Sequence, residues 1–220
     1  MRRSLVLDVA GWAALVSADA AEQLGAAESA SIIPDQQRRR LPRFSRDVLR
    51  CALPLLREAP HTPVILSSPH GDLHSTVTLL TDVARRAPLS PSLFGLSVHN
   101  APTGALSLCL DGPGDQSAIG GGAETLSAGL IEAYARLATD EATAIVLIHA
   151  DERLPPIYAE LDEDTPGVFF ALSLRLAGEE AHNAIDVGAG RQGAVDVVQA
   201  LASGGRRLRF AWRSAPARAA

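Results

Sequence analysis

The sequence predicts an α/β fold, a layered β-sheet covered by helices. Segments with strand character alternate along the chain with segments whose apolar residues recur at helical spacing. The two clearest strands are 144–149 and 168–176, in which apolar residues predominate. The clearest helix precedes them and carries Leu126, Leu130 and Leu137 on one face.

Composition is that of a globular chain and excludes several kinds of chemistry. Of the 220 residues, 47% are hydrophobic and 20% charged, which suits one domain with a real core. All 20 basic residues are arginine, so phosphate-loop lysines, Schiff bases and lysine general bases are excluded. The net charge of −5 argues against nucleic acid as the main partner. Cys51 and Cys109 lack the spacing of a disulfide framework or a zinc site.

The N-terminus imitates a secretion signal only briefly. Asp8 interrupts the first apolar run, and no convincing cleavage site follows it. No apolar stretch reaches the roughly 20 residues needed to span a membrane. We therefore expect a cytoplasmic protein.

In the first third of the chain, residues 4–16 predict a strand with its continuation. Residues 18–37 are rich in small side chains and indicate a surface loop with a short helix. Apolar residues between 44 and 56 share one helical face, and we expect Pro54 to kink or stop that helix. Residues 64–68 form a short buried strand.

The next segments are a helix, a loop and a turn. Helical spacing covers 72–86, with Asp72 placed to favour its start. A loop with three prolines follows it, and 104–110 fits a helical turn or a strand. Residues 111–115 are a strong turn signal.

Beyond residue 177 the sequence is rich in Gly and Ala. It predicts one more helix at about 194–202 and a last strand at 208–212.

Residues 90–152 contain the most specific motifs. A proline-led loop precedes Ser97–Gly104, whose sequence is Ser-Val-His-Asn-Ala-Pro-Thr-Gly, and Gly112–Gly114 precedes the run 114–125. These segments resemble the part of beta-ketoacyl synthases that contains the nucleophile, and 114–125 aligns to it without a gap. Together with Ser67–His74, the pattern is similar to the small ketosynthase-like N-terminal, or chain-length-factor, proteins of aryl-polyene-type gene clusters.

This resemblance implies half of a thiolase-like fold, a mixed β-sheet flanked by helices. Residues 1–176 would form the ketoacyl-synthase-like N-terminal domain, and 177–220 an extension packed on it or trailing from it. Ala123 stands where an active ketosynthase has its cysteine, and nothing after Leu176 is similar to the histidine-bearing second half of those enzymes. The resemblance therefore implies no condensing activity.

The resemblance to ketosynthases also implies a role and partners for this chain. The chain would be a non-catalytic partner in fatty acid or polyketide-type (aryl polyene) biosynthesis, binding a full-length ketosynthase, an acyl carrier protein or both, as a homodimer or heterodimer. No cofactor is implied. Half of such a fold is expected to expose the apolar face that its twin would cover.

The candidate site residues fall into two groups. A site that contacts an acyl group or positions its loop would include His99, Asn100, Gly122, Ala123 and Glu124. Within it, the glycines either cradle an anion or simply permit the turn. A carrier protein would meet Arg38, Arg39, Arg40 and Arg43, for which a solvated helix start is an equal alternative.

The sequence gives weaker indications of three other kinds of chemistry. Ser68 with His99 would suit a small acyl-thioester hydrolase or acyltransferase, although the Gly-x-Ser-x-Gly elbow of many hydrolases is missing. His70 and His74 have a spacing seen in metal sites, but no third ligand is evident nearby and we expect no metal. Cys109 lies among leucines, which predicts a buried, inert thiol.

Overall fold

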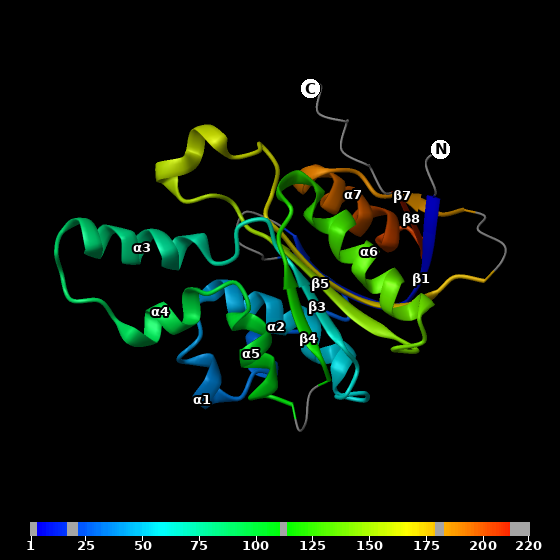
Figure 1. Cartoon of the computed structure of the whole chain (residues 1–220), viewed down its shortest axis with the longest axis horizontal. Coiled ribbons are helices and arrows are strands. Elements are labelled where there is room, and N and C mark those ends of the chain that lie inside the picture. Colours follow the sequence, from blue (N-terminus) through cyan, green and yellow to red (C-terminus); the bar gives the residue numbers. More distant parts are fainter. Residues whose placement is uncertain (1–3, 17–21, 111–113, 179–182, 212–220) are drawn as a thin grey trace.

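The computed structural model of the chain describes residues 4–16, 22–110, 114–178 and 183–211 (Figure 1). The strands are β1 (Ser4–Val16), β2 (Glu22–Gly25), β3 (Val64–Ser67), β4 (Gln116–Ile119), β5 (Ile145–Asp151), β6 (Val168–Leu176), β7 (Ile185–Asp186) and β8 (Arg207–Ala211). The α-helices are α1 (Asp35–Arg38), α2 (Arg43–Leu56), α3 (Leu73–Ala84), α4 (Pro91–Ser97), α5 (Ala101–Ser107), α6 (Thr125–Ala138) and α7 (Gly190–Ala202). The 3-10 helices are η1 (Ala30–Ile32), η2 (Gly122–Glu124) and η3 (Pro156–Leu161).

The strands form one eight-stranded mixed sheet in the order β4-β3-β5-β6-β1-β8-β7, with β2 paired to β1. The first three strands of this order are parallel, and β6 is antiparallel to both of its neighbours. The α/β class and the mixed sheet flanked by helices are therefore confirmed.

Each face of the sheet has its own core because side chains alternate along a strand. On one face, α2 and α5 cover Val146 and Ile148 of β5. On the other, α6 and α7 cover Ile145 and Leu147 of the same strand. All seven residues of β5 are buried, which is why its sequence is apolar apart from His149 and Asp151.

Most of the predicted elements are present, with three differences. The helix α2 continues through Pro54 to Leu56, so the proline neither stops nor shortens it. The segment predicted as loop and short helix also contains the strand β2. The proline-rich loop contains the helix α4, where the Ser90 hydroxyl accepts a hydrogen bond from the Leu93 N–H and Pro91 opens the first turn. For residues 104–110 the helical alternative of the prediction is the correct one, because they include the end of α5 at Ser107.

The predicted turn at 111–115 lies partly outside the described residues. Its fourth residue, Gly114, is described, and a Cβ there would lie 2.2 Å from the carbonyl oxygen of His61. Only glycine fits this approach to the neighbouring loop.

The helix α3 is correctly predicted but oriented unexpectedly. The Asp72 carboxylate caps it by accepting hydrogen bonds from the N–H and the hydroxyl of Ser75. The second half of the apolar stripe that predicts this helix, however, is turned outward, with Leu80 54% and Val83 57% exposed. Figure 1 shows α3 and α4 extending away from the sheet.

The apolar face of α6 is covered within the chain. Leu126 and Leu130 of α6 share a core with Val195 and Val198 of α7. The exposed apolar surface that the resemblance implies therefore does not lie over α6. Large exposed apolar side chains occur instead on α3, around α4 and on η3, the last with Ile157 and Leu161. Among the described residues, no helix combines the length and apolar character that crossing a membrane requires.

Candidate functional site

A tight turn joins the edge strand β4 to α6. Gly122 has a φ of +56°, a left-handed conformation that favours glycine. The buried Thr125 hydroxyl accepts a hydrogen bond from the Gly121 N–H at 2.8 Å and donates one to the Gly122 carbonyl at 2.7 Å. These bonds fix the turn ahead of the helix. The left-handed Gly122 and these two bonds show that the glycines serve the turn itself.

Ala123 lies at the top of this turn with its side chain exposed, and so does Glu124. The peptide dipoles of α6 make the helix start the place where a thiolate would be stabilised. Ala123 offers a methyl group there, which can neither attack an acyl carbon nor hold a proton.

His99 lies directly against the turn. A Cβ on Gly71 would be 3.2 Å from its Nδ1, and a Cβ on Gly120 would be 3.7 Å from its Cε1. Its Nε2 is buried and has no hydrogen-bond partner among the described residues. The imidazole therefore packs between the loop after β3 and the end of β4, where it is placed to hold the two loops apart.

Asn100 does not join this cluster. It precedes α5 with an exposed side chain that makes no capping hydrogen bond. The structure thus brings His99, Gly122, Ala123 and Glu124 to one turn, whereas Asn100 lines a separate groove between α1, α4 and α5.

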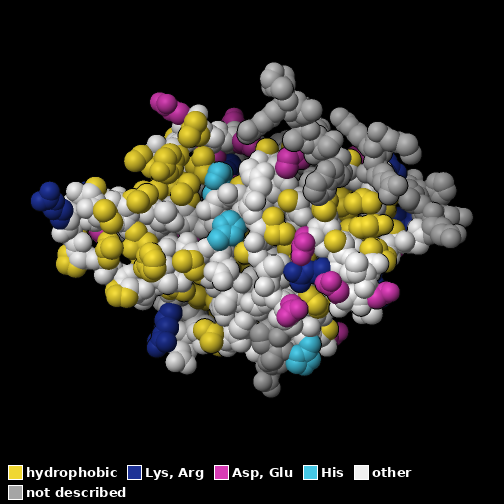
Figure 2. Space-filling model, in the orientation of Figure 1, with side chains coloured by type: hydrophobic (Ala, Val, Ile, Leu, Met, Phe, Trp, Pro, Cys, Tyr) yellow, Lys and Arg dark blue, Asp and Glu magenta, His cyan; other side chains and the backbone are white. Residues whose placement is uncertain are grey.

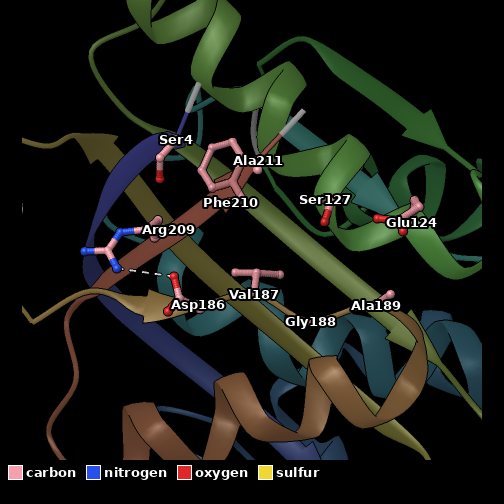
Figure 3. A pocket seen from close by; sticks show the side chains of 10 residues that line it. All are labelled: Ser4, Glu124, Ser127, Asp186, Val187, Gly188, Ala189, Arg209, Phe210 and Ala211. Atoms are coloured by element: carbon pink, nitrogen blue, oxygen red, sulfur yellow. Dashed lines mark hydrogen bonds and ion pairs between the residues drawn. The ribbon is translucent and has the colours of Figure 1, made fainter. Parts of the chain in front are cut away.

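A pocket of about 330 Å³ opens beside the start of α6. Figure 3 shows Glu124 and Ser127 facing it from the α6 side, opposite the ion pair of Arg209 with Asp186. That ion pair measures 3.3 Å. The mixed lining of hydroxyl, carboxylate and guanidinium groups suits a polar ligand better than an acyl chain.

Ser68 is not placed as a nucleophile. Its side chain is buried, and its hydroxyl oxygen accepts a hydrogen bond from the Gly71 N–H at 2.9 Å. Within the part of the chain that the structure describes, no hydrogen bond links Ser68 to His99.

The histidines near α3 also serve separate roles. His74 Nε2 lies 3.1 Å from the carbonyl oxygen of Arg153, while His70 is exposed. In the described ranges, no three side chains of metal-ligating type gather into a site.

A buried serine–histidine pair was not anticipated. Ser67 Oγ lies 3.0 Å from His149 Nδ1, and the imidazole packs on Phe170 with ring centroids 5.2 Å apart. Burial lowers the pKa of His149 to about 3, so the ring is neutral near pH 7. The pair is sealed from solvent, which makes it part of the core. A histidine inside an otherwise apolar strand is the only sequence signal for it.

Two acidic residues at the end of β5 lie in different surroundings. Asp151 pairs with the buried Arg191 of α7 at 3.1 Å, and Arg191 also pairs with Asp162 at 2.7 Å. Burial raises the pKa of Asp151, and the charge of Arg191 opposes that rise. Glu152 has no such partner for its Oε1.

Glu152 borders a small cavity of about 130 Å³ together with Arg43 and His74. Burial, with the negative charge of Asp72 adding to it, raises the pKa of Glu152 to about 8. This carboxyl group therefore holds its proton near neutral pH. A perturbed pKa next to a cavity marks a candidate site, and also a source of pH-dependent stability.

The arginine cluster around the start of α2 is only partly paired. Arg38 pairs with Asp35, and Arg43 lies 3.5 Å from Asp47. Arg39 and Arg40 are exposed. The cluster is thus a solvent-facing basic edge, with Arg40 bordering the groove that Asn100 lines.

Neither cysteine is placed for catalysis. Cys51 is completely buried, and burial raises its pKa far above the usual range. Cys109 is half-buried against the core, and burial raises its pKa as well.

Comparison with known proteins identifies relatives of this fold. A family model described as "Beta-ketoacyl synthase, N-terminal domain" matches residues 11–213. A search of curated protein sequences finds no match.

Many solved structures have a similar fold, among them the following three. A chain of the complex of ketosynthase ApeO with its chain length factor ApeC from Xenorhabdus doucetiae is 24% identical, with a TM-score of 0.67 over 80% of this chain and 81% of that one. A beta-ketoacyl synthase from Burkholderia phymatum is 15% identical, with a TM-score of 0.59 over 80% of this chain and 60% of that one. A chain of AntDE:AntF, a type II PKS acyl-carrier protein in complex with its ketosynthase, is 13% identical, with a TM-score of 0.59 over 94% of this chain and 84% of that one. At these identities the likeness establishes a shared fold.

Proposed function

This chain belongs to the beta-ketoacyl synthase N-terminal domain family, and we propose that it acts there as a non-catalytic, chain-length-factor-like partner of a complete ketosynthase. The observation that carries the proposal is Ala123, an exposed alanine at the head of α6, at the position where the sequence resemblance implies the family's cysteine. The fold is retained while the nucleophile is not. A role in aryl-polyene-type or other polyketide or fatty acid synthesis, in the cytoplasm, remains part of this proposal.

The outward-facing apolar surface supports a protein partner. Leu80 and Val83 lie on the exposed stripe of α3, and Phe94 of α4 is 61% exposed. Figure 2 shows hydrophobic side chains gathered over the part of the molecule that α3, α4 and η3 form. Exposed apolar surface of this kind marks interaction sites.

The edge strand β4 adds a second feature to this side of the molecule. It pairs with β3 on one side only, and no described strand covers its other side. Its free edge presents N–H and C=O groups to which another strand could bind. A ketosynthase that covers this edge and α3 would bury both.

A carrier protein would use a different surface. Arg38, Arg39, Arg40 and Arg43 form a basic edge on a chain of net charge −5, which favours an acidic partner at that place. We propose that an acyl carrier protein docks there through its acidic residues.

The alternative, an acyl-thioester hydrolase or acyltransferase using Ser68 and His99, has less support. It needs an accessible hydroxyl next to a base, whereas Ser68 is 1% exposed and hydrogen-bonded to the backbone. Turnover of acyl thioesters that is lost on His99→Ala would favour it over the partner role.

The partner role is tested by co-purification with the complete ketosynthase encoded nearest to this chain. We expect a stable complex with the unmodified chain and its loss with Leu80→Glu plus Val83→Glu. Leu176→Glu is the matched control, because Leu176 is 43% exposed at the end of β6, away from α3. A well-behaved monomer with no affinity for ketosynthase or carrier protein would refute the proposal.

A further inference from the structure

A groove of about 800 Å³ lies where α1, α4 and α5 meet. Its floor is apolar and includes Leu41, Leu96 and Ala105, while Arg40 and Asn100 stand at its border. Small-molecule sites in proteins have this size and this composition, mostly apolar with a few polar groups.

Two glycines keep the groove open. A Cβ placed on Gly95 of α4 or on Gly104 of α5 would meet no atom within 4 Å. Neither glycine is required by a left-handed backbone, because neither has a positive φ. Their lack of side chains leaves room along α5 for a narrow apolar chain to lie against the helix.

The charge of the groove is of one sign. Arg40 is its single charged lining residue, and the remaining polar groups are the amides of Gln37 and Asn100 and the hydroxyl of Ser92. The Arg40 guanidinium makes no hydrogen bond or ion pair with another described residue. Guanidinium binds carboxylates through paired, charge-assisted hydrogen bonds.

We propose that this groove binds an amphiphile with one anionic head, with a medium-chain fatty-acid carboxylate as its ligand class. The carboxylate pairs with Arg40, and the alkyl chain lies over Gly104 and Ala105 toward Leu96. The proposal concerns the isolated chain and does not depend on a ketosynthase partner.

The test is titration of the purified full chain with decanoate, followed by calorimetry, with uncharged decanol and decyltrimethylammonium as comparison ligands. We expect saturable binding of decanoate, weaker binding of decanol and none of the cation. Arg40→Gln should weaken decanoate binding about tenfold and leave decanol unchanged, because one charge-assisted pair is lost. Arg85→Gln, an exposed arginine after α3 and outside the groove, should change neither.

Gly104→Leu tests the position of the alkyl chain. The new side chain has open space and would fill the groove, so decanoate and decanol should both lose binding while the melting temperature is retained. Equal affinity for anion and cation, no saturable binding, or binding unaffected by both Arg40→Gln and Gly104→Leu would overturn the proposal. Failure here leaves the ketosynthase co-purification result unaffected, so the two proposals can be judged separately.

Discussion

Arg191 at the start of α7 and Asp151 at the end of β5 form an ion pair of 3.1 Å in which both side chains are nearly excluded from solvent. Arg191 also donates to the backbone carbonyl of Glu152 at 2.9 Å and pairs with Asp162, which follows η3. One guanidinium therefore joins α7, the sheet and the segment that carries η3. Its hydrogen bonds satisfy groups that burial would otherwise leave unpaired.

Removal of this guanidinium should lower the stability of the folded chain. Arg191→Met leaves Asp151 buried without its ion-pair partner and Asp162 with Arg153 alone, so we expect the free energy of unfolding to fall by about 3–5 kcal/mol in urea titrations. The exposed pair Arg38–Asp35 provides the control, and Arg38→Gln should cost less than about 1 kcal/mol. Equal effects of the two substitutions would contradict the structural role of Arg191.

Glu152 should make stability depend on pH in a particular direction. Its pKa is about 8 in the folded chain against 4.5 in the unfolded chain. Between these pH values the folded state holds a proton that the unfolded state has lost. The contribution of protonated Glu152 to the free energy of unfolding is therefore fully present below pH 4.5, and it is lost as the pH rises through 8. The slope is at most about 1.4 kcal/mol per pH unit for one proton.

Glu152→Gln removes this dependence because the amide cannot ionise. The difference in unfolding free energy, variant minus unmodified chain, should therefore increase from pH 5 to pH 8. His149 titrates equally in both proteins and cancels from the difference. A difference that stays constant over this range would show that Glu152 is ionised in the folded chain.

The layered fold was predictable because its signals are local. The sequence of β5 predicts a buried strand, and the spacing of Leu126, Leu130 and Leu137 predicts α6. What local patterns cannot supply is orientation. The stripe of α3 is as regular as that of α6, yet its second half faces solvent, because periodicity identifies an apolar face without identifying what covers it.

The candidate site was predictable in part for a similar reason. Gly122, Ala123 and Glu124 are consecutive, so the motif that identifies one places all three at the turn. His99 is brought there from another segment, which the resemblance implies and periodicity does not. Neither the raised pKa of Glu152 nor the burial of Arg191 has a sequence pattern, because both depend on neighbours distant in the chain.

Gly129 should be irreplaceable in α6, because the helix lies close to the sheet at this point. A Cβ there would be 2.9 Å from Leu147 Cδ1 and 3.0 Å from Ser67 Cβ. Gly129→Val should therefore destabilise the chain by about 1–3 kcal/mol in thermal or urea unfolding. Gly104→Ala, also within a helix but facing open space, should be neutral or stabilising by up to about 1 kcal/mol. A neutral Gly129→Val would mean that α6 can move away from the sheet.

The turn should still activate a thiol if one is supplied. Ala123→Cys places a cysteine on the exposed head of α6, where the helix dipole lowers the pKa of a thiol. Ala138→Cys is the matched control, an exposed alanine at the other end of the same helix, where the dipole acts in the opposite direction. At pH 7 we expect iodoacetamide to modify the Ala123→Cys variant at least several-fold faster, as followed by intact mass. Because the native Cys51 is buried and the native Cys109 is half-buried, both should react slowly in each variant. Equal modification rates at the two positions would mean that the turn no longer has the electrostatics of a nucleophile site. A cysteine at position 123 would then be insufficient to restore a reactive thiol.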